Sequence, residues 1–282
     1  MRQSWLFLSM LLWGCGGEPP TEAPKTQPAA EPKQEAPAAK TFKLDPAQLA
    51  KAAEEIALVP SPAEMQKALS NAGLQAKLAE MVASDKDITM DVENKDQLAV
   101  RTGVVLADLV LTVKTSSKEL LLARLAKLKV GFEKLGAGSD IQATIDEMST
   151  QINNDAINRD DLLKEIDELS GVMVPELEYE AGEWVVPLIQ AGSWLEGAHL
   201  VSNAIKTESK FDSADKLLKQ PAVVDYFLKY VQREGREKAD DQVVAQLEST
   251  LLKLKEVANS SKIDEAGVNT IFSSTSDVLK LL

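Results

Sequence analysis

This 282-residue chain has few of the side chains on which most metal sites and many enzymes depend. It contains one cysteine, Cys15, and one histidine, His199, and aromatic residues make up only 5% of it. A structural zinc site needs about four ligands, usually cysteine or histidine, so the composition excludes one. With a single thiol, the chain can form no internal disulfide bond and has no second cysteine to act as a nucleophile. We therefore expect no metal ion and no cofactor.

Positive charge is also scarce. The chain has 31 Lys and Arg residues against 44 Asp and Glu residues, a formal net charge of −13. Acids and bases balance within residues 1–41, so the excess negative charge lies on the remainder. Nucleic-acid binding needs a basic surface, and anionic lipid headgroups attract one. We therefore expect neither nucleic acid nor anionic lipid to bind this domain by charge.

Residues 1–14 have the pattern of an export signal. Arg2 precedes a short apolar run from Trp5 to Trp13. A membrane-spanning helix needs roughly 20 apolar residues, so this run is too short to be a stable anchor by itself. The pattern predicts a signal peptide that is removed from the mature protein.

The four residues Leu12-Trp13-Gly14-Cys15, which end this segment, resemble the lipobox of bacterial lipoproteins. The resemblance implies that Cys15 becomes the first mature residue and carries three acyl chains, which anchor the protein in a membrane. Trp13 departs from the pattern because it is bulkier than the usual residue. Gly16, in place of Asp, implies delivery to the outer membrane of the envelope. The alternative is an ordinary secretory signal in which Cys15 is incidental.

Residues 15–41 are predicted to be a disordered tether. Six of the chain's twelve prolines lie in this range, among Ala, Glu, Gln, Lys and Thr. Such a segment cannot bury enough apolar surface to offset the entropy lost on ordering. Its prolines favour an extended, semi-rigid polyproline II spacer. A proline-rich ligand for a partner domain is the alternative.

Residues 42–282 are predicted to form one all-α domain of about nine to eleven helices, since no stretch alternates convincingly with the period of a strand. Helix starts are predicted at Asp45-Pro46, Ser61-Pro62, Ser116 with Glu119, Ser139 with Gln142, and Asn158, and helix ends at Gly73 and Gly136. Two segments, 103–113 and 184–199, are apolar on nearly every side and are predicted to be the central helices. Small residues, including Gly192 and Gly197, would let another backbone approach the second one closely.

Three short segments carry a resemblance to a family. They are Pro60-Ser61-Pro62, the segment 103–109 with the pattern Gly-x-x-x-Ala-Asp-Leu, and Gly192-Ser193-Trp194-Leu195-Glu196. In this order they resemble a helical family of lipoproteins from environmental, Bacteroidetes-like bacteria. The resemblance covers roughly residues 58–206 and implies no activity, because the family is uncharacterised. Residues 207–282 lie beyond it and are interpreted as a candidate helical extension.

Polar side chains on the two central helices are the candidate site residues. They are Arg101, Asp108, Ser193, Glu196, His199 and Asn203. A buried charge needs a partner, so the favoured interpretation is structural. Arg101, two helical turns before Asp108, is expected to neutralise it, and His199, one turn after Glu196, to do the same there. The alternative is a polar ligand pocket built from Ser193, Glu196, His199 and Asn203.

Catalytic interpretations of these residues are weaker. Asp108 and Glu196 could act as acid and base in glycoside hydrolysis, but such clefts are usually lined by aromatic residues. A Ser-His-acid triad lacks its Gly-x-Ser-x-Gly elbow, and a di-iron site needs a second histidine. The acidic run from Asp85 lacks the glycine and glutamate of a calcium loop. We therefore expect a non-catalytic envelope module that contacts the membrane through its lipid and binds an envelope protein; a small-ligand-binding or hydrolytic module is the alternative.

Overall fold

The computed structural model describes residues 62–84, 88–182, 184–238 and 241–280, which belong to one compact unit. The predicted signal, the tether and the helix start at Asp45-Pro46 lie outside the described residues. Within these ranges the chain is helical and has no strand, which confirms the all-α prediction. No helix in the described ranges combines the length and the apolar character needed to cross a membrane.

The described part contains twelve α-helices, a π-helical turn η1 and a short 3-10 turn η2. In chain order they are α2 (Pro62–Ala72), α3 (Gln75–Ser84), α4 (Lys95–Thr112), α5 (Lys118–Leu135), α6 (Ser139–Asn153), α7 (Arg159–Glu168), η1 (Leu169–Met173), α8 (Val174–Ala181), α9 (Val185–Thr207), η2 (Phe211–Ser213), α10 (Ala214–Leu218), α11 (Pro221–Lys238), α12 (Asp241–Asn259) and α13 (Glu265–Leu279). The count slightly exceeds the expected nine to eleven because short helices such as the five-residue α10 count separately.

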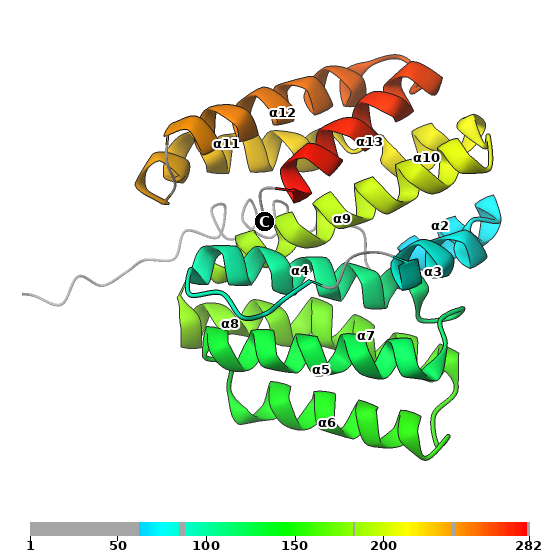
Figure 1. Ribbon diagram of the computed structural model, residues 1–282, viewed down its shortest axis with the longest axis vertical. Helices are drawn as coiled ribbons and strands as arrows, with labels where there is room; N and C mark the ends of the chain where they lie inside the picture. Colours follow the sequence, from blue (N-terminus) through cyan, green and yellow to red (C-terminus); the bar gives the residue numbers. More distant parts are fainter. Residues whose placement is uncertain (1–61, 85–87, 183, 239–240, 281–282) are drawn as a thin grey trace, which may run out of the picture. The chain divides into compact units, whose positions relative to one another are not determined.

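Helices α4 and α9 pack along each other at the centre, as the two apolar segments predicted (Figure 1). The crossing depends on two glycines. A Cβ added to Gly103 would overlap the carbonyl oxygen of Ile189, and one added to Gly192 would overlap that of Val100. Gly192 therefore permits the close approach expected of it, whereas a Cβ on Gly197 would meet nothing within 4 Å.

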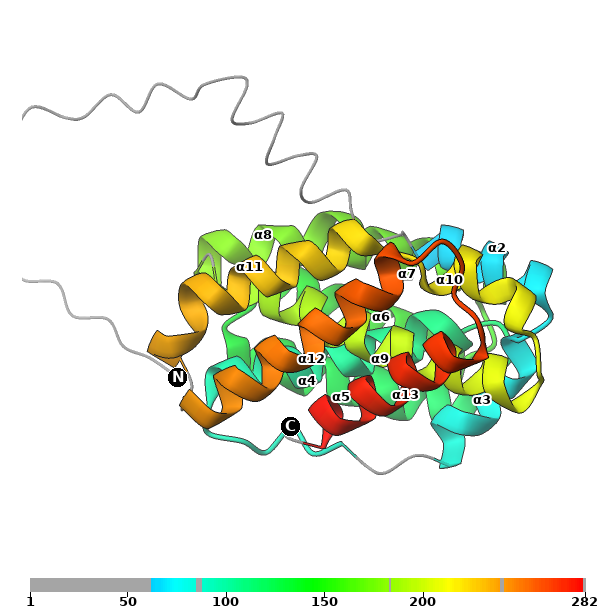
Figure 2. The ribbon, with the colours of Figure 1, turned by 90° about the horizontal axis from the view of Figure 1, so that it is seen from above.

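The central pair separates two hydrophobic cores. Helices α5 and α6 stack beyond α4, and α11, α12 and α13 cover α9 (Figures 1 and 2). One core contains Val105, Phe132 and Ile145, from α4, α5 and α6. The other contains Leu200 and Val268, which join α9 to α13. The candidate extension therefore packs on α9 and shares a core with it.

Helix ends follow the predicted local signals in part. Gly73 and Gly136 have φ values of 66° and 94°, which a left-handed helix end requires, and the Asn158 side chain accepts hydrogen bonds from two backbone N–H groups of α7. The N-cap of α5 is Ser117 and not Ser116, because the helix begins one residue later than predicted. Ser139 lies inside α6, whose N-cap is Gly138.

A π-helical turn interrupts the helical run between α7 and α8. At η1 the backbone N–H of Val174 bonds the carbonyl of Leu169, five residues back. Pro175 follows at once and has no N–H to give the carbonyl of Gly171, the bond that an α-helix would make there. Such turns widen a helix locally and are frequent at functional sites.

Candidate functional site

Asp108 is held in a buried ion pair between the central helix α4 and its neighbour α5. The Arg124 Nε atom lies 3.0 Å from Asp108 Oδ2, and the two side chains are 7% and 4% exposed. Arg124 Nη2 also donates to the backbone oxygen of Val82, at 3.1 Å. The ion pair ties α4 to α5, and the second contact ties α5 to α3.

The prediction that Arg101 neutralises Asp108 is wrong. The residue that pairs with Asp108 in the structure is Arg124. Seven residues along a helix separate two positions by about 10 Å, a long reach for a short aspartate side chain. Arg101 Nη1 instead donates to the Thr89 carbonyl at 2.8 Å, and this hydrogen bond links the segment before α4 to the helix. Arg124, which the sequence analysis did not single out, sits directly across the helix interface.

Glu196 and His199 both belong to α9, one turn apart, but they differ in how deeply they are buried. The Glu196 residue is buried, 3% exposed, whereas His199 is half-buried. The His199 ring stacks on Phe272 of α13 with centroids 4.9 Å apart, and its Nδ1 lies 3.4 Å from the Thr275 hydroxyl oxygen. His199 therefore helps to pack α9 against α13.

Ser193 and Asn203 complete the predicted polar set. The Ser193 hydroxyl donates to the Gly103 carbonyl at 2.8 Å, a bond that bridges the close crossing of α4 and α9. Asn203 is half-buried farther along α9.

These positions do not form an accessible acid–base pair. Asp108 and Glu196 are each 3% exposed, and the Asp108 carboxylate is engaged by Arg124. Among the described residues, no three His, Cys, Asp or Glu side chains gather closely enough to hold a metal ion.

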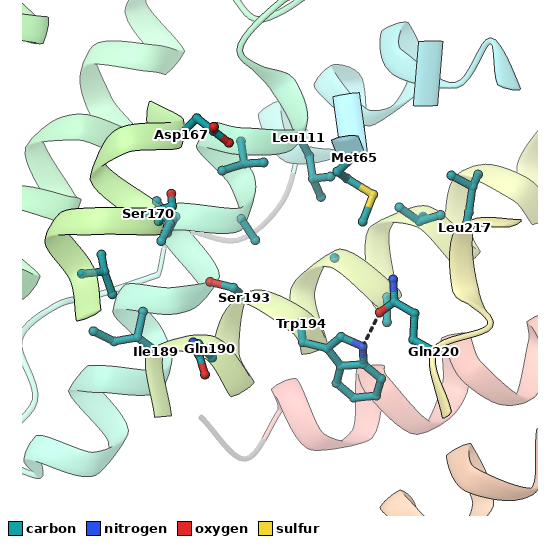
Figure 3. Close-up of a pocket in the computed structure, with 18 of the residues that line it drawn as sticks. Met65, Leu111, Asp167, Ser170, Ile189, Gln190, Ser193, Trp194, Leu217 and Gln220 are labelled. Carbon is teal, nitrogen blue, oxygen red and sulfur yellow. Dashed lines mark hydrogen bonds between the residues drawn. The ribbon is translucent and has the colours of Figure 1, made fainter. Parts of the chain in front are cut away.

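Beside Ser193 lies a cavity of about 280 Å³, which we call the Ser193 hollow (Figure 3). It is a partly open pocket lined mainly by residues of α2, α4, η1, α9 and α10, and its lining includes residues of both hydrophobic cores. Its apolar wall includes Met65, Leu106, Val110, Leu111, Val201 and Leu217. Ligand sites of this kind are mostly apolar with a few placed polar groups, and they begin near 300 Å³.

The polar groups of the Ser193 hollow stand at its edges. The side-chain amide oxygen of Gln220, Oε1, accepts from the Trp194 indole N–H at 2.9 Å, and Figure 3 shows the amide nitrogen of Gln220 turned away from the indole. The Gln190 carboxamide and this Gln220 nitrogen have no hydrogen-bond partner in the part of the chain that the structure describes. The one ionisable side chain among the described lining residues is Asp167.

A second cavity, of about 370 Å³, lies on the other side of Trp194. We call it the Phe227 hollow, after the ring that packs against Trp194 at a centroid distance of 5.7 Å. Helices α4, α9, α11 and α12 supply most of its wall, which is almost entirely apolar.

The described residues that line the Ser193 hollow include one of the six predicted polar residues, Ser193. The sequence analysis missed Gln190, Gln220 and Ser170, because isolated polar residues on helices carry no motif. The π-helical turn had a readable signal, the pair Gly171 and Pro175 within a helical pattern.

Comparison with known protein families, with curated proteins and with solved structures finds no match to this chain.

Proposed function

We propose that the chain is a lipid-anchored protein of the bacterial envelope whose helical domain acts by binding and not by catalysis. The observation that carries the anchor is Cys15, the chain's one cysteine, placed directly after a short apolar run. Acyl chains on this residue would hold the protein at the membrane, since more than one chain gives lasting attachment. Gly16 favours the outer membrane.

The helical domain favours binding because its candidate catalytic side chains already serve the packing. Asp108 is paired with Arg124, Ser193 bridges two helices, and His199 stacks on Phe272. A catalytic acid or base must reach the proton that it transfers, and the Asp108 carboxylate is already engaged by Arg124. The acidic surface is suited to an envelope protein partner with basic residues and disfavours nucleic acid.

The second candidate, a small-ligand-binding module, is favoured by the Ser193 hollow. Its ligand would contact Ser193 and the carboxamides at the edges, and not the buried Glu196. This candidate is compatible with the anchor, because a tethered domain can carry a ligand site.

Membrane fractionation of a Cys15→Ser variant tests the anchor. The native chain is expected to be in the membrane fraction and to incorporate labelled palmitate. The Cys15→Ser variant is expected to be in the soluble fraction and to incorporate no label. Ser9→Ala, in the same apolar run, is the matched control and should behave as the native chain does. Unchanged membrane association of Cys15→Ser would show that the lipoprotein assignment is wrong.

A further inference from the structure

We propose that the Ser193 hollow binds an uncharged lipid with a single acyl chain, of the monoacylglycerol class. The inference rests on the proposed function in one respect: a lipid-anchored domain works where such molecules are present. The site itself is argued from the residues that enclose it.

Two of the residues that line the hollow are glycines, so neither position contributes a side chain to its wall. Gly171 lies in η1 and Gly197 in α9, and a Cβ added to either would meet no atom within 4 Å. In most of the core, by contrast, side chains interdigitate and leave no such space. Both positions therefore have room for a larger side chain.

The π-helical turn shapes the same wall. Ser170, Gly171 and Val174 belong to η1 or its edge, and all three line the hollow. The Ser170 hydroxyl donates to the Ile166 carbonyl at 2.8 Å, which leaves its oxygen lone pairs available as acceptors. The widened turn thus places an acceptor beside an apolar cavity.

The lining selects an apolar chain with an uncharged, hydrogen-bonding head. Its carbon-rich wall favours an acyl chain, because burying apolar surface removes that surface from water. Gln190 and the Gln220 amide nitrogen can bind a carbonyl or a hydroxyl. A carboxylate head is disfavoured, because it would be desolvated against an apolar wall with no basic side chain among the described lining residues.

The test is a displacement assay on the purified full chain carrying Cys15→Ser, so that the protein's own acyl chains are absent. The fluorescent probe N-phenyl-1-naphthylamine is bound first and is then displaced by monolauroylglycerol or by laurate. Monolauroylglycerol is expected to displace the probe at about tenfold lower concentration than laurate, because burying an unpaired charge opposes laurate binding. Equal potency of the two would overturn the assignment of an uncharged head.

Two variants place a larger side chain at positions that line the hollow. Gly197→Leu and Gly171→Leu are each expected to weaken monolauroylglycerol binding by about tenfold or more, because the added side chain takes the ligand's space. Circular dichroism checks that each variant is folded, and either one suffices if the other is not. Ala126→Leu, on the exposed face of α5, adds bulk away from both cavities and should leave binding unchanged.

The matched control for location is Gly235→Leu, which adds bulk at the wall of the Phe227 hollow. Loss of binding in this variant, with Gly197→Leu and Gly171→Leu unaffected, would overturn the proposal in favour of the second cavity.

Failure of this inference is distinguishable from failure of the anchor. Binding is measured on a chain without lipid, so absence of ligand binding rejects the site whatever Cys15 does. Membrane association that does not depend on Cys15 rejects the anchor and leaves the binding result in place.

Discussion

Asp108 and Arg124 show how a charge is accommodated inside a helical domain. Both side chains are more than nine-tenths buried, and each lies against the other across the interface of α4 and α5. Removing one member of a buried ion pair leaves the other charge in a medium that solvates it poorly. The ion pair is therefore a structural link between α4 and α5 whose loss is costly.

We expect Arg124→Met to lower the free energy of unfolding by about 3–5 kcal/mol, because it leaves the Asp108 carboxylate without its guanidinium. The double variant Asp108→Asn/Arg124→Met should lose less than the sum of the two single variants. Urea denaturation of the four proteins measures this coupling. Additive losses would contradict it, since independent sites add.

Glu165 gives the domain a pH-dependent contribution. Burial raises the pKa of this carboxyl above its ordinary value, and the nearby Glu147 raises it further, against a hydrogen bond from Gln151. Because the folded-state pKa is the higher one, the folded protein binds the proton more tightly than the unfolded chain does. Ionised Glu165 therefore destabilises the fold at neutral pH, and protonation removes this effect.

Glu165→Gln is accordingly expected to raise the melting temperature at pH 7. The gain should shrink as the pH falls through the carboxyl's pKa, because the native side chain is then neutral as well. Thermal denaturation between pH 7 and pH 3.5 tests this. Glu133→Gln, on the exposed face of α5, is the control and should show no comparable gain. A gain that is constant with pH would point to a cause other than ionisation.

At the scale of elements, the crossing of α4 and α9 depends on the absence of two side chains. The backbone of each helix approaches a glycine of the other, Gly103 or Gly192, and the Ser193 hydroxyl bonds across the same contact. Two helices can come this close only where no Cβ intervenes.

Two alanine substitutions in α9 should therefore have opposite effects. Gly192→Ala is expected to destabilise the protein by about 3 kcal/mol, because its Cβ would overlap the Val100 carbonyl and force the helices apart. Gly197→Ala, five residues along the same helix, is expected to stabilise by about 0.5–1 kcal/mol, since the added methyl meets open space and alanine is the better helix former. Chemical denaturation compares them, and equal effects would contradict the close crossing.

At the scale of the whole molecule, the chain consists of segments that differ in composition and charge. Residues 16–41 contain few large apolar residues and nearly balanced charges, four Glu against three Lys, whereas residues 42–282 carry the net charge of −13. We propose that this segment is a spacer between a membrane anchor and the helical domain, because a segment of this composition buries too little apolar surface to form part of a core.

Deletion of residues 16–41 should leave the stability of the helical domain unchanged. The urea midpoint of the deleted chain is expected to equal that of the full chain, because the removed residues bury too little surface to stabilise a fold. A lower midpoint, measured by circular dichroism at 222 nm, would show that these residues pack on the domain.

Several features were predictable from the sequence because they depend on local chemistry. Apolar residues on every side predicted that segments 103–113 and 184–199 are central, and Gly73, Gly136 and Asn158 predicted helix boundaries. These signals act within a few residues of each other, so one chain suffices to read them.

What the sequence by itself determined, then, is the all-α class, the central pair of helices and several of their ends, because periodicity and capping are local. Only the tertiary structure decided which side chains meet. It gave Asp108 the partner Arg124 from α5, placed His199 against Phe272 of α13, and brought η1 opposite α9 around a hollow. These contacts join residues far apart in the chain, and they are fixed by how whole helices pack, which no local pattern of residues encodes.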